Sequence, residues 1–288
     1  MKILGLALGG GGSRALAHVG VLRVLEEEGF AVGMVAASSL GALVGGAYAV
    51  HPDARNLQAS FETYFRTAKA FRRHRRAVTG TGMPRGDGFW GRLARRLGTA
   101  GFLAILTART GIMRKNPLHD AAMALLPDID ISSTKIPFAC NAIDLTAGEP
   151  VLFRDGSLRE AVKAGSQVGV VFPPHVYGGR HYIDAAPISS VPVAAARELG
   201  ADIVLAVDMR SPLEPMDRFI TGVDVLGRLE ATTSNLHNNR EIGTADVVIT
   251  LDALQAVAWR DFSDVGRIIE AGATAARQAM PALRKALA

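Results

Sequence analysis

Cysteine is almost absent from this sequence: its 288 residues contain a single one, Cys140. A single thiol excludes an internal disulfide framework and a metal cluster held by several cysteines, and it fits a reducing compartment. With 49% hydrophobic residues, the chain has enough apolar material for a buried core without covalent cross-links. We therefore expect Cys140 to be a small core residue.

Long apolar runs are lacking as well. The best candidate for a membrane span, residues 101–107 (GFLAILT), is followed by Arg109 and falls well short of the roughly 18 apolar residues that a span requires. The apolar stretch after Lys2 stops at four glycines and is too short for the core of a secretory signal. These absences predict a cytoplasmic protein whose contact with a membrane, if any, is peripheral.

Positive charge is concentrated in one part of the chain. Residues 66–115 contain 13 lysines or arginines and one acid, Asp87, a balance of +12; since the whole chain carries +5, the remainder carries −7. This asymmetry favours an anionic partner such as a lipid surface, although a solvated basic face would have the same composition. No recognition helix or interleaved aromatic motif accompanies the arginines, so no nucleic acid is expected. We interpret residues 60–125, beginning with a basic helix over 60–78, as a lid or cap insertion within a single domain spanning 1–288.

The rest of the chain alternates between strand and helix patterns. Apolar runs at residues 3–8 and 30–37 each end in a turn of small residues, and helical spacing follows at 15–28 and 41–50. Two strand–turn–helix units in succession indicate an α/β fold with a parallel sheet and crossover helices. The same patterns predict strands at 138–142, 181–184, 203–208 and 246–251, and helices at 158–164, 192–199 and 265–287.

The first motif that carries chemistry is Ala37-Ser38-Ser39-Leu40-Gly41. It nearly matches the G-x-S-x-G nucleophile elbow, in which a serine occupies a strained strand-to-helix turn and small neighbours let other segments approach. The serine hydroxyl then stands at a helix N-terminus, where free N–H groups stabilise negative charge. Ser38 is the rival, but its register would put Leu40 where a small residue belongs. Ser39 is therefore the predicted nucleophile.

Four consecutive glycines, Gly9 to Gly12, follow the first predicted strand. Consecutive glycines let backbone N–H groups converge on an anion. A nucleotide phosphate fits poorly, because a P-loop would end in Gly-Lys-Ser or Gly-Lys-Thr and the dinucleotide fingerprint would need a glycine where Arg14 or Ala15 stands. An oxyanion hole serving Ser39 is the simpler interpretation, with Arg14 bracing the loop or meeting a phosphate.

The third motif is HYIDAAP at residues 181–187, where a short predicted strand ends in Asp184. A serine nucleophile needs a base, ordinarily a histidine oriented by an acid. His175 and His181 are candidates because they lie near Asp184 in the sequence. The simpler arrangement is a dyad in which Asp184 itself takes the proton from Ser39. Because an aspartate has an ordinary pKa of about 4, such a dyad needs a raised pKa or strong oxyanion stabilisation.

Together the three motifs resemble those of the patatin-like phospholipase family. The likeness continues in LAHVGVLRVLEEEGF (16–30), in NAIDLTAGEPVLFRDGSLREAVKAGSQVGVVFPP (141–174) and in AVAWRDFSDVGRIIEAGATAA (256–276), so it covers nearly the whole chain outside roughly residues 60–125. The resemblance implies a three-layer α/β/α fold with a mainly parallel sheet and hydrolysis of glycerolipid acyl esters without a metal or another cofactor. The site that it implies consists of Ser39 as nucleophile, Asp184 as base, the amides of Gly10, Gly11, Gly12 and Leu40 as oxyanion hole, and Arg14 in support.

The chain departs from the family pattern at four positions. Alanine replaces the usual glycine at Ala15, Ala37 and Ala185, and Gly169 stands where proline is usual. A glycine needed for a positive φ is replaced only at a cost of about 1 kcal/mol or more, whereas one needed for room can be replaced by a small shift. We expect the fold to persist with an intact site, or with a reduced rate or altered substrate. The alternatives are a weakened family member that binds lipid through its basic segment, and an acyltransferase that uses the same acyl-enzyme.

Overall fold

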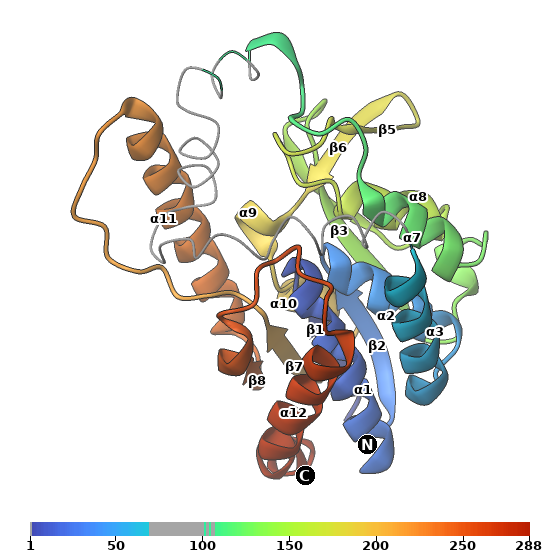
Figure 1. Cartoon of the computed structure of the whole chain (residues 1–288). Coiled ribbons are helices and arrows are strands. Elements are labelled where there is room, and N and C mark those ends of the chain that lie inside the picture. Colours follow the sequence, from blue (N-terminus) through green and yellow to red (C-terminus); the bar gives the residue numbers. More distant parts are fainter. Residues whose placement is uncertain (1, 69–100, 102–103, 105–106) are drawn as a thin grey trace.

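A computed structural model describes residues 2–68, 101, 104 and 107–288, which fold around one mixed sheet (Figure 1). Seven of its eight strands run in the order β5-β6-β3-β2-β1-β7-β8, and the eighth, β4, pairs with β3. The neighbours β3-β2-β1-β7-β8 are parallel, whereas β4, β5 and β6 are antiparallel to their partners. The strands are β1 (Leu4–Leu8), β2 (Val32–Ala37), β3 (Phe138–Asp144), β4 (Glu149–Phe153), β5 (His175–Tyr177), β6 (Arg180–Asp184), β7 (Ile203–Asp208) and β8 (Val247–Thr250).

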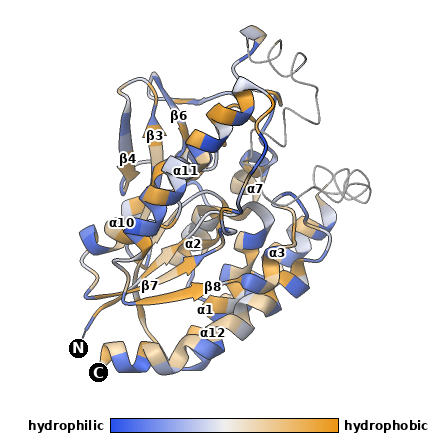
Figure 2. Ribbon diagram, turned by 90° about the vertical axis from the view of Figure 1, so that its left-hand side faces the viewer, coloured by the Kyte–Doolittle hydropathy of each residue, from blue (hydrophilic) through white to orange (hydrophobic). Residues whose placement is uncertain are grey.

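Helices cover both faces of the sheet, which makes three layers (Figure 2). The larger core lies under α1 (Ala17–Glu27), α2 (Leu40–Val50), α3 (Ala54–Thr67), α7 (Pro117–Leu125), α8 (Leu158–Gly165) and α12 (Val265–Leu287). The smaller core lies under α10 (Val193–Glu198), beside which are α9 (Ala186–Ser189) and α11 (Gly222–Ile242). The short 3₁₀ helices are η1 (Gly12–Leu16), η2 (Ile131–Ser133) and η3 (Asp252–Leu254). The three-layer fold with a mainly parallel sheet is confirmed.

The two cores follow from the alternation of side chains along the central strands. In β1, Leu6 and Leu8 contribute to the larger core, whereas Ala7 between them contributes to the smaller one. The neighbouring strand β2 repeats the pattern, with Val35 on the larger side and Ala36 on the smaller. Because successive residues of a strand point to opposite faces, a continuous apolar run is what a sheet covered on both sides requires.

The first and last helices, α1 and α12, pack against each other unusually closely. A side chain at Gly20 would overlap the backbone at Ile269, and one at Gly272 would overlap the backbone at Ala17. Glycine is therefore required at both crossing points for steric reasons. This contact joins residues near the two ends of the sequence and covers one side of the sheet (Figure 1).

The observed boundaries differ from the predicted ones at several elements. The helix predicted over 15–28 begins at Ala17, because residues 12–16 form a 3₁₀ helix, and the strand predicted over 30–37 begins at Val32. The helix predicted over 60–78 is present over 60–67 but has different ends: α3 begins at Ala54, where the Asp53 side chain caps the Asn56 N–H, and it ends at Thr67. Residues 69–78 lie outside the described residues. The sequence patterns also missed α7, α9, α11, β4 and β5.

The predicted basic lid over 60–125 stays a prediction, because most of its charged part lies outside the described residues. Its two ends belong to the body of the fold: α3 buries Phe61 and Phe65, and α7 packs against α8. None of the helices in the described part of the chain combines the length and the apolar character needed to cross a bilayer.

Candidate active site

Ser39 lies at the turn between β2 and α2, in a conformation that is rare for a residue with a side chain. Its backbone angles are φ 54° and ψ −132°, and α2 begins at the next residue, Leu40. The turn is crowded: a side chain at Gly41 would come within 2.6 Å of the carbonyl oxygens of Leu8 and Gly9. The predicted nucleophile elbow is thus present in its backbone geometry, with Ser39 at the carboxyl end of the sheet.

The two adjacent serines have different surroundings. Ser39 borders a cavity, whereas Ser38 is fully buried and its hydroxyl has no hydrogen-bond partner among the described residues. Ser38 directly follows β2 and does not line the cavity. Ser39 alone of the pair is placed to meet a ligand.

Asp184, the last residue of β6, lies beside Ser39. Strand β6 pairs with β3 so that Asp184 is opposite Ala142, and its side chain is only 4% exposed. The carboxylate accepts a hydrogen bond from the Ala186 N–H at 2.9 Å and a second one from the Ser39 hydroxyl. Burial raises the pKa of Asp184 to about 6, and the two hydrogen bonds, which favour the charged form, oppose that rise. The fold thus brings the predicted pair, Ser39 and Asp184, together, and the pKa of the Asp184 carboxyl is closer to neutrality than that of an ordinary aspartate.

The glycine loop approaches Ser39 from β1. The Cα of Gly10 is so close that a side chain there would lie 2.9 Å from the Ser39 Cβ. The Gly10 N–H already donates to the Ser190 carbonyl at 2.9 Å. By contrast, the N–H groups of Gly11 and Gly12 donate to no other group in the described part of the chain, and neither does the N–H of Leu40. Three of the four predicted oxyanion donors are therefore available, and Gly10 fixes the loop instead.

Arg14 braces this loop from within. Its Nε donates to the Gly11 carbonyl at 3.3 Å, and a terminal nitrogen donates to the Ser211 hydroxyl at 2.9 Å. The bond to Gly11 turns that carbonyl toward the guanidinium group. Of the two roles that the sequence left open for Arg14, bracing the loop and meeting a phosphate, these contacts correspond to the first.

None of the candidate histidines reaches Ser39. His175 bonds to the Glu160 carboxylate at 2.8 Å, and His181 is exposed near Thr146. The histidine that does approach the site is His18, whose Nε2 lies 2.7 Å from the Gly9 carbonyl oxygen. Its sequence signal was weak, because a lone histidine on the apolar face of a helix is usually a packing residue.

A small, mostly apolar cavity of about 50 Å³, partly open to solvent, begins at Ser39. Three segments far apart in the sequence form its walls: the start of α7, the loop after α8 and the loop before α12. The lining residues are Gly12, Ser39, Asn116, Pro117, Leu118, Val168, Phe172, Trp259, Arg260 and Phe262. Its lining suits an apolar group bound next to the Ser39 hydroxyl.

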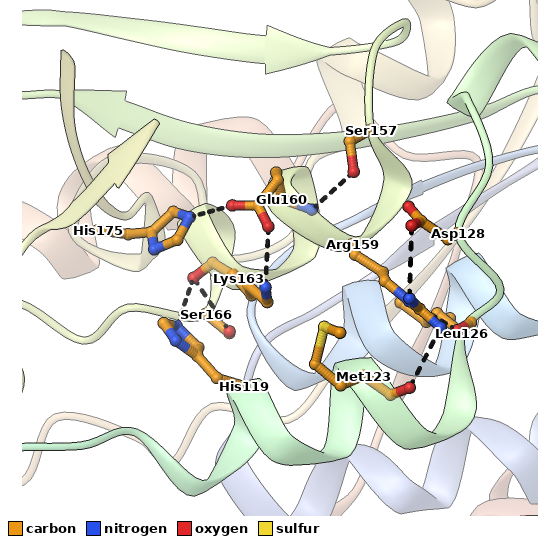
Figure 3. A network of polar contacts seen from close by, with 10 residues as sticks. All are labelled: His119, Met123, Leu126, Asp128, Ser157, Arg159, Glu160, Lys163, Ser166 and His175. Atoms are coloured by element: carbon orange, nitrogen blue, oxygen red, sulfur yellow. Dashed lines mark hydrogen bonds and ion pairs between the residues drawn. The ribbon is translucent and has the colours of Figure 1, made fainter. Parts of the chain in front are cut away.

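Polar contacts between α7 and α8 hold one wall of the cavity in place (Figure 3). Glu160 on α8 lies between His175 and Lys163, with contacts of 2.8 Å to each. Arg159 on the same helix donates to the carbonyls of Leu126 and Met123 at the end of α7. Because the carbonyls at a helix end lack intrahelical partners, the guanidinium group both caps α7 and ties it to α8.

A second wall carries local strain at Val170. This β-branched residue has φ 64°, and within the described residues only Ser39 shares a positive φ without being glycine. The carbonyl of Val170 accepts the Ile112 N–H at 2.9 Å, and Val171 accepts the Met113 N–H at 2.8 Å. Residues 111–113 are thereby paired with a segment that contributes Phe172 to the cavity.

The three alanines that replace family glycines are not strained. Ala15, Ala37 and Ala185 are almost completely buried, and none of them has a positive φ. Glycine at these positions would be needed only for room, and the fold accommodates the extra methyl groups. The local backbone therefore does not require a loss of activity.

The described residues contain no group of three or more histidine, cysteine, aspartate or glutamate side chains that could hold a metal ion. Cys140 is buried in the larger core, as predicted, and burial raises the pKa of its thiol far above the usual range.

A strained serine at the carboxyl end of a mainly parallel sheet, above an apolar cavity, is the arrangement that defines α/β hydrolytic enzymes with a nucleophile elbow. Within that class, the chain belongs to the patatin-like phospholipase family, whose model, described as "Patatin-like phospholipase", matches residues 6–197. The resemblance inferred from the motifs is confirmed.

Similar proteins have been found both in sequence and in structure. An uncharacterized NTE family protein of Mycobacterium bovis is 28% identical over 235 residues, which is 80% of this chain and 56% of that protein. A protein named lysophospholipase NTE1 from Mycosarcoma maydis is 29% identical over 210 residues, 72% of this chain and 10% of that protein. The chain therefore spans about half or less of the length of these relatives. The crystal structure of VipD from Legionella pneumophila shares the fold, with a TM-score of 0.51 and 14% identity over 98% of this chain and 67% of that one.

Proposed function

We propose that the protein is a serine acyl hydrolase that cleaves fatty-acyl esters of phospholipids or lysophospholipids through a Ser39–Asp184 dyad. The observation that carries this proposal is the buried Asp184 carboxyl, with its pKa raised to about 6, beside the strained Ser39 at the mouth of an apolar cavity. A base with a pKa near the working pH is suited to general acid–base catalysis. Membership of the family and the lysophospholipase named among the relatives support the same substrate class.

In the first half-reaction, the Ser39 oxygen attacks the ester carbonyl and its proton passes to Asp184. The N–H groups of Gly11, Gly12 and Leu40 stabilise the negative charge that develops on the carbonyl oxygen. The tetrahedral intermediate then collapses, the bond to the alcohol oxygen breaks, and that oxygen takes the proton from Asp184. The products are the free alcohol or lysolipid and an acyl group esterified to Ser39, with its chain in the cavity.

In the second half-reaction, a water molecule gives its proton to Asp184 and attacks the acyl-enzyme. The same amides stabilise the second oxyanion, the bond to Ser39 breaks, and the serine oxygen recovers the proton from Asp184. A fatty acid is released and the dyad returns to its initial state. In each half-reaction Asp184 takes a proton from the attacking oxygen and gives it to the leaving oxygen. One carboxylate therefore performs both transfers, and the mechanism needs no histidine.

The basic segment 66–115 stays a candidate for peripheral contact with anionic lipid, which its charge of +12 would favour. The alternative of a weakened family member that only binds lipid is less well supported, because the three alanines leave the site geometry without strain.

The test is labelling with a fluorescent fluorophosphonate together with hydrolysis of phosphatidylcholine and lysophosphatidylcholine. We expect labelling and hydrolysis in the wild type, loss of both in Ser39→Ala, and weakened labelling in Asp184→Asn. Ser38→Ala is the matched control: it removes a neighbouring hydroxyl that is fully buried and does not line the cavity, so it should leave labelling intact. A folded wild type that neither labels nor hydrolyses either lipid would refute the proposal and favour the binding-only alternative.

A further inference from the structure

Helix α11 extends well beyond the sheet at the end where Ser39 lies. Its 21 residues correspond to a length of about 31 Å at 1.5 Å per residue. Its last residue, Ile242, leads into the start of β8, whose four residues cover only about 13 Å. The first half of α11 therefore passes the carboxyl ends of the strands (Figure 1).

The inner side of α11 is firmly attached to the domain. Asn238 is 1% exposed; its side-chain nitrogen donates to the Ala186 carbonyl at 3.1 Å, and its oxygen accepts the Ser190 N–H. The start of the helix is fixed by a capping box between Thr221 and Asp224. The second half of α11 is thus fixed to the domain, and the projecting first half begins with a formed cap.

The outer side of the same half is apolar. Of the eleven exposed large hydrophobic residues in the described part of the chain, six lie between residues 219 and 236. Val225, Leu226 and Leu229 share one face of the helix and are 54%, 67% and 62% exposed. Just before the helix, Phe219 and Ile220 are 48% and 69% exposed. We name these five residues the α11 ridge; the apolar colouring along α11 can be followed in Figure 2.

A cluster of exposed apolar side chains marks an interaction site, because scattered ones are normal but contiguous ones are not. The charges around the ridge indicate which kind of lipid surface would bind it. Residues 214–230 contain four acids (Glu214, Asp217, Asp224 and Glu230) and two arginines (Arg218 and Arg228), so the segment carries −2 and no excess of positive charge. An apolar ridge without positive charge suits the interface of a zwitterionic bilayer, where apolar side chains enter below the headgroups without electrostatic attraction to anionic lipid.

We propose that the α11 ridge docks the protein on a zwitterionic phospholipid surface. The ridge and the Ser39 turn lie at the same end of the sheet, so docking through α11 brings the carboxyl-end face that carries Ser39 close to the bilayer. The claim that the docked lipid is also the substrate rests on the proposed function, whereas the docking itself does not. This surface is distinct from the basic segment, whose contact would require anionic lipid.

The test measures flotation with phosphatidylcholine vesicles in a Ser39→Ala background, so that no product changes the membrane. The ridge variant is Leu226→Gln with Leu229→Gln, which keeps good helix formers on α11. The control variant is Leu145→Gln with Val176→Gln, two positions of similar exposure elsewhere on the surface. We expect the ridge variant to lose binding by roughly tenfold or more, the control to bind like the parent, and salt to have little effect.

A second measurement uses active Ser39. The ridge variant should hydrolyse a soluble short-chain ester at the wild-type rate while losing activity on phosphatidylcholine vesicles, and its far-UV circular dichroism should be unchanged. If no ester is hydrolysed by any variant but binding still depends on the ridge, the docking stands and the proposed function fails.

Three results would overturn the docking proposal. The first is equal vesicle binding by the ridge variant and the parent. The second is binding only to anionic vesicles, abolished by salt, which would point to the basic segment. The third is a parent protein that does not bind vesicles but self-associates in sedimentation, with dissociation in the ridge variant, which would make a second copy of the chain the partner.

Discussion

His18 on the first helix places its Nε2 atom 2.7 Å from the carbonyl oxygen of Gly9, at the entrance of the glycine loop. Burial lowers the pKa of His18 to about 4, so the ring is neutral near neutral pH. Since a carbonyl can only accept, Nε2 carries the ring proton and donates it, and Nδ1 is left buried without a partner among the described residues. A buried side chain of α1 thereby holds the loop that supplies the proposed oxyanion donors.

Replacing His18 should affect both stability and catalysis. We expect His18→Leu to lower the free energy of unfolding by about 1–3 kcal/mol, because it leaves the Gly9 carbonyl buried without a donor. The turnover number should fall with it, since the loop loses its support. His18→Gln, which can still donate, should recover part of both quantities. Urea denaturation and ester kinetics measure the two effects, and an unchanged turnover number in a destabilised His18→Leu would contradict the positioning role.

The pH dependence of hydrolysis should report Asp184. Because Asp184 accepts a proton in the proposed mechanism, it must be ionised in the free enzyme. With its pKa raised to about 6, kcat/KM on a soluble ester should rise with pH and reach half its maximum near pH 6. An ordinary carboxyl would give this midpoint at about pH 4. If kcat/KM did not change between about pH 4 and pH 7, the result would argue against Asp184 as the base.

The same carboxyl should make the protein less stable as the pH rises. The pKa of Asp184 is higher in the folded state than in the unfolded chain, so the folded state holds the proton more tightly and stability is lost between about pH 4 and pH 6. Asp184→Asn removes this loss. We expect the variant to be more stable than the wild type by up to about 3 kcal/mol at about pH 8, with little difference at about pH 4. Denaturant titrations at both values measure the difference, and an equal difference at both would contradict the prediction.

Acyl-chain preference should depend on Phe172, which lines the cavity and is 3% exposed. We expect Phe172→Leu to enlarge the cavity and to shift the optimum of kcat/KM toward longer acyl chains. The control is Phe153→Leu: this ring packs against Tyr182 away from the cavity, so the change should lower stability without altering the preference. A series of esters of increasing chain length measures the shift, and parallel behaviour of the two variants would exclude a role for Phe172 in specificity.

The sequence alone was sufficient to locate the residues of the proposed site, because each lies in a turn whose chemistry is local. Ser39 requires a small residue two positions later, the glycine loop requires consecutive glycines, and Asp184 ends a short strand. The partner of the Gly10 N–H was not predictable in this way, since Ser190 is 180 positions distant and only the folded sheet brings it near.

The missed elements have physical reasons of a different kind. Helix α11 buries only three residues, Asp224, Gly227 and Asn238, and its leucines are exposed, so its sequence lacks the apolar stripe by which helices are recognised. The helix predicted at 60–78 was placed by its basic charges, whereas the observed start of α3 depends on the cap by Asp53. The positive φ of Val170 contradicts the preference of a β-branched residue and follows from its tertiary setting.

The order of the strands has a consequence for synthesis of the protein on the ribosome. The strand that leads to the glycine loop, β1, lies between β2 and β7, and the cavity is closed by residues up to Phe262. A nascent chain that has exposed Ser39 therefore lacks Asp184, the cavity walls and the second neighbour of its central strand. Such long-range pairing folds slowly and leaves apolar strands uncovered until the later strands are added. It also means that the proposed esterase activity cannot arise before the segment up to Phe262 has been synthesised.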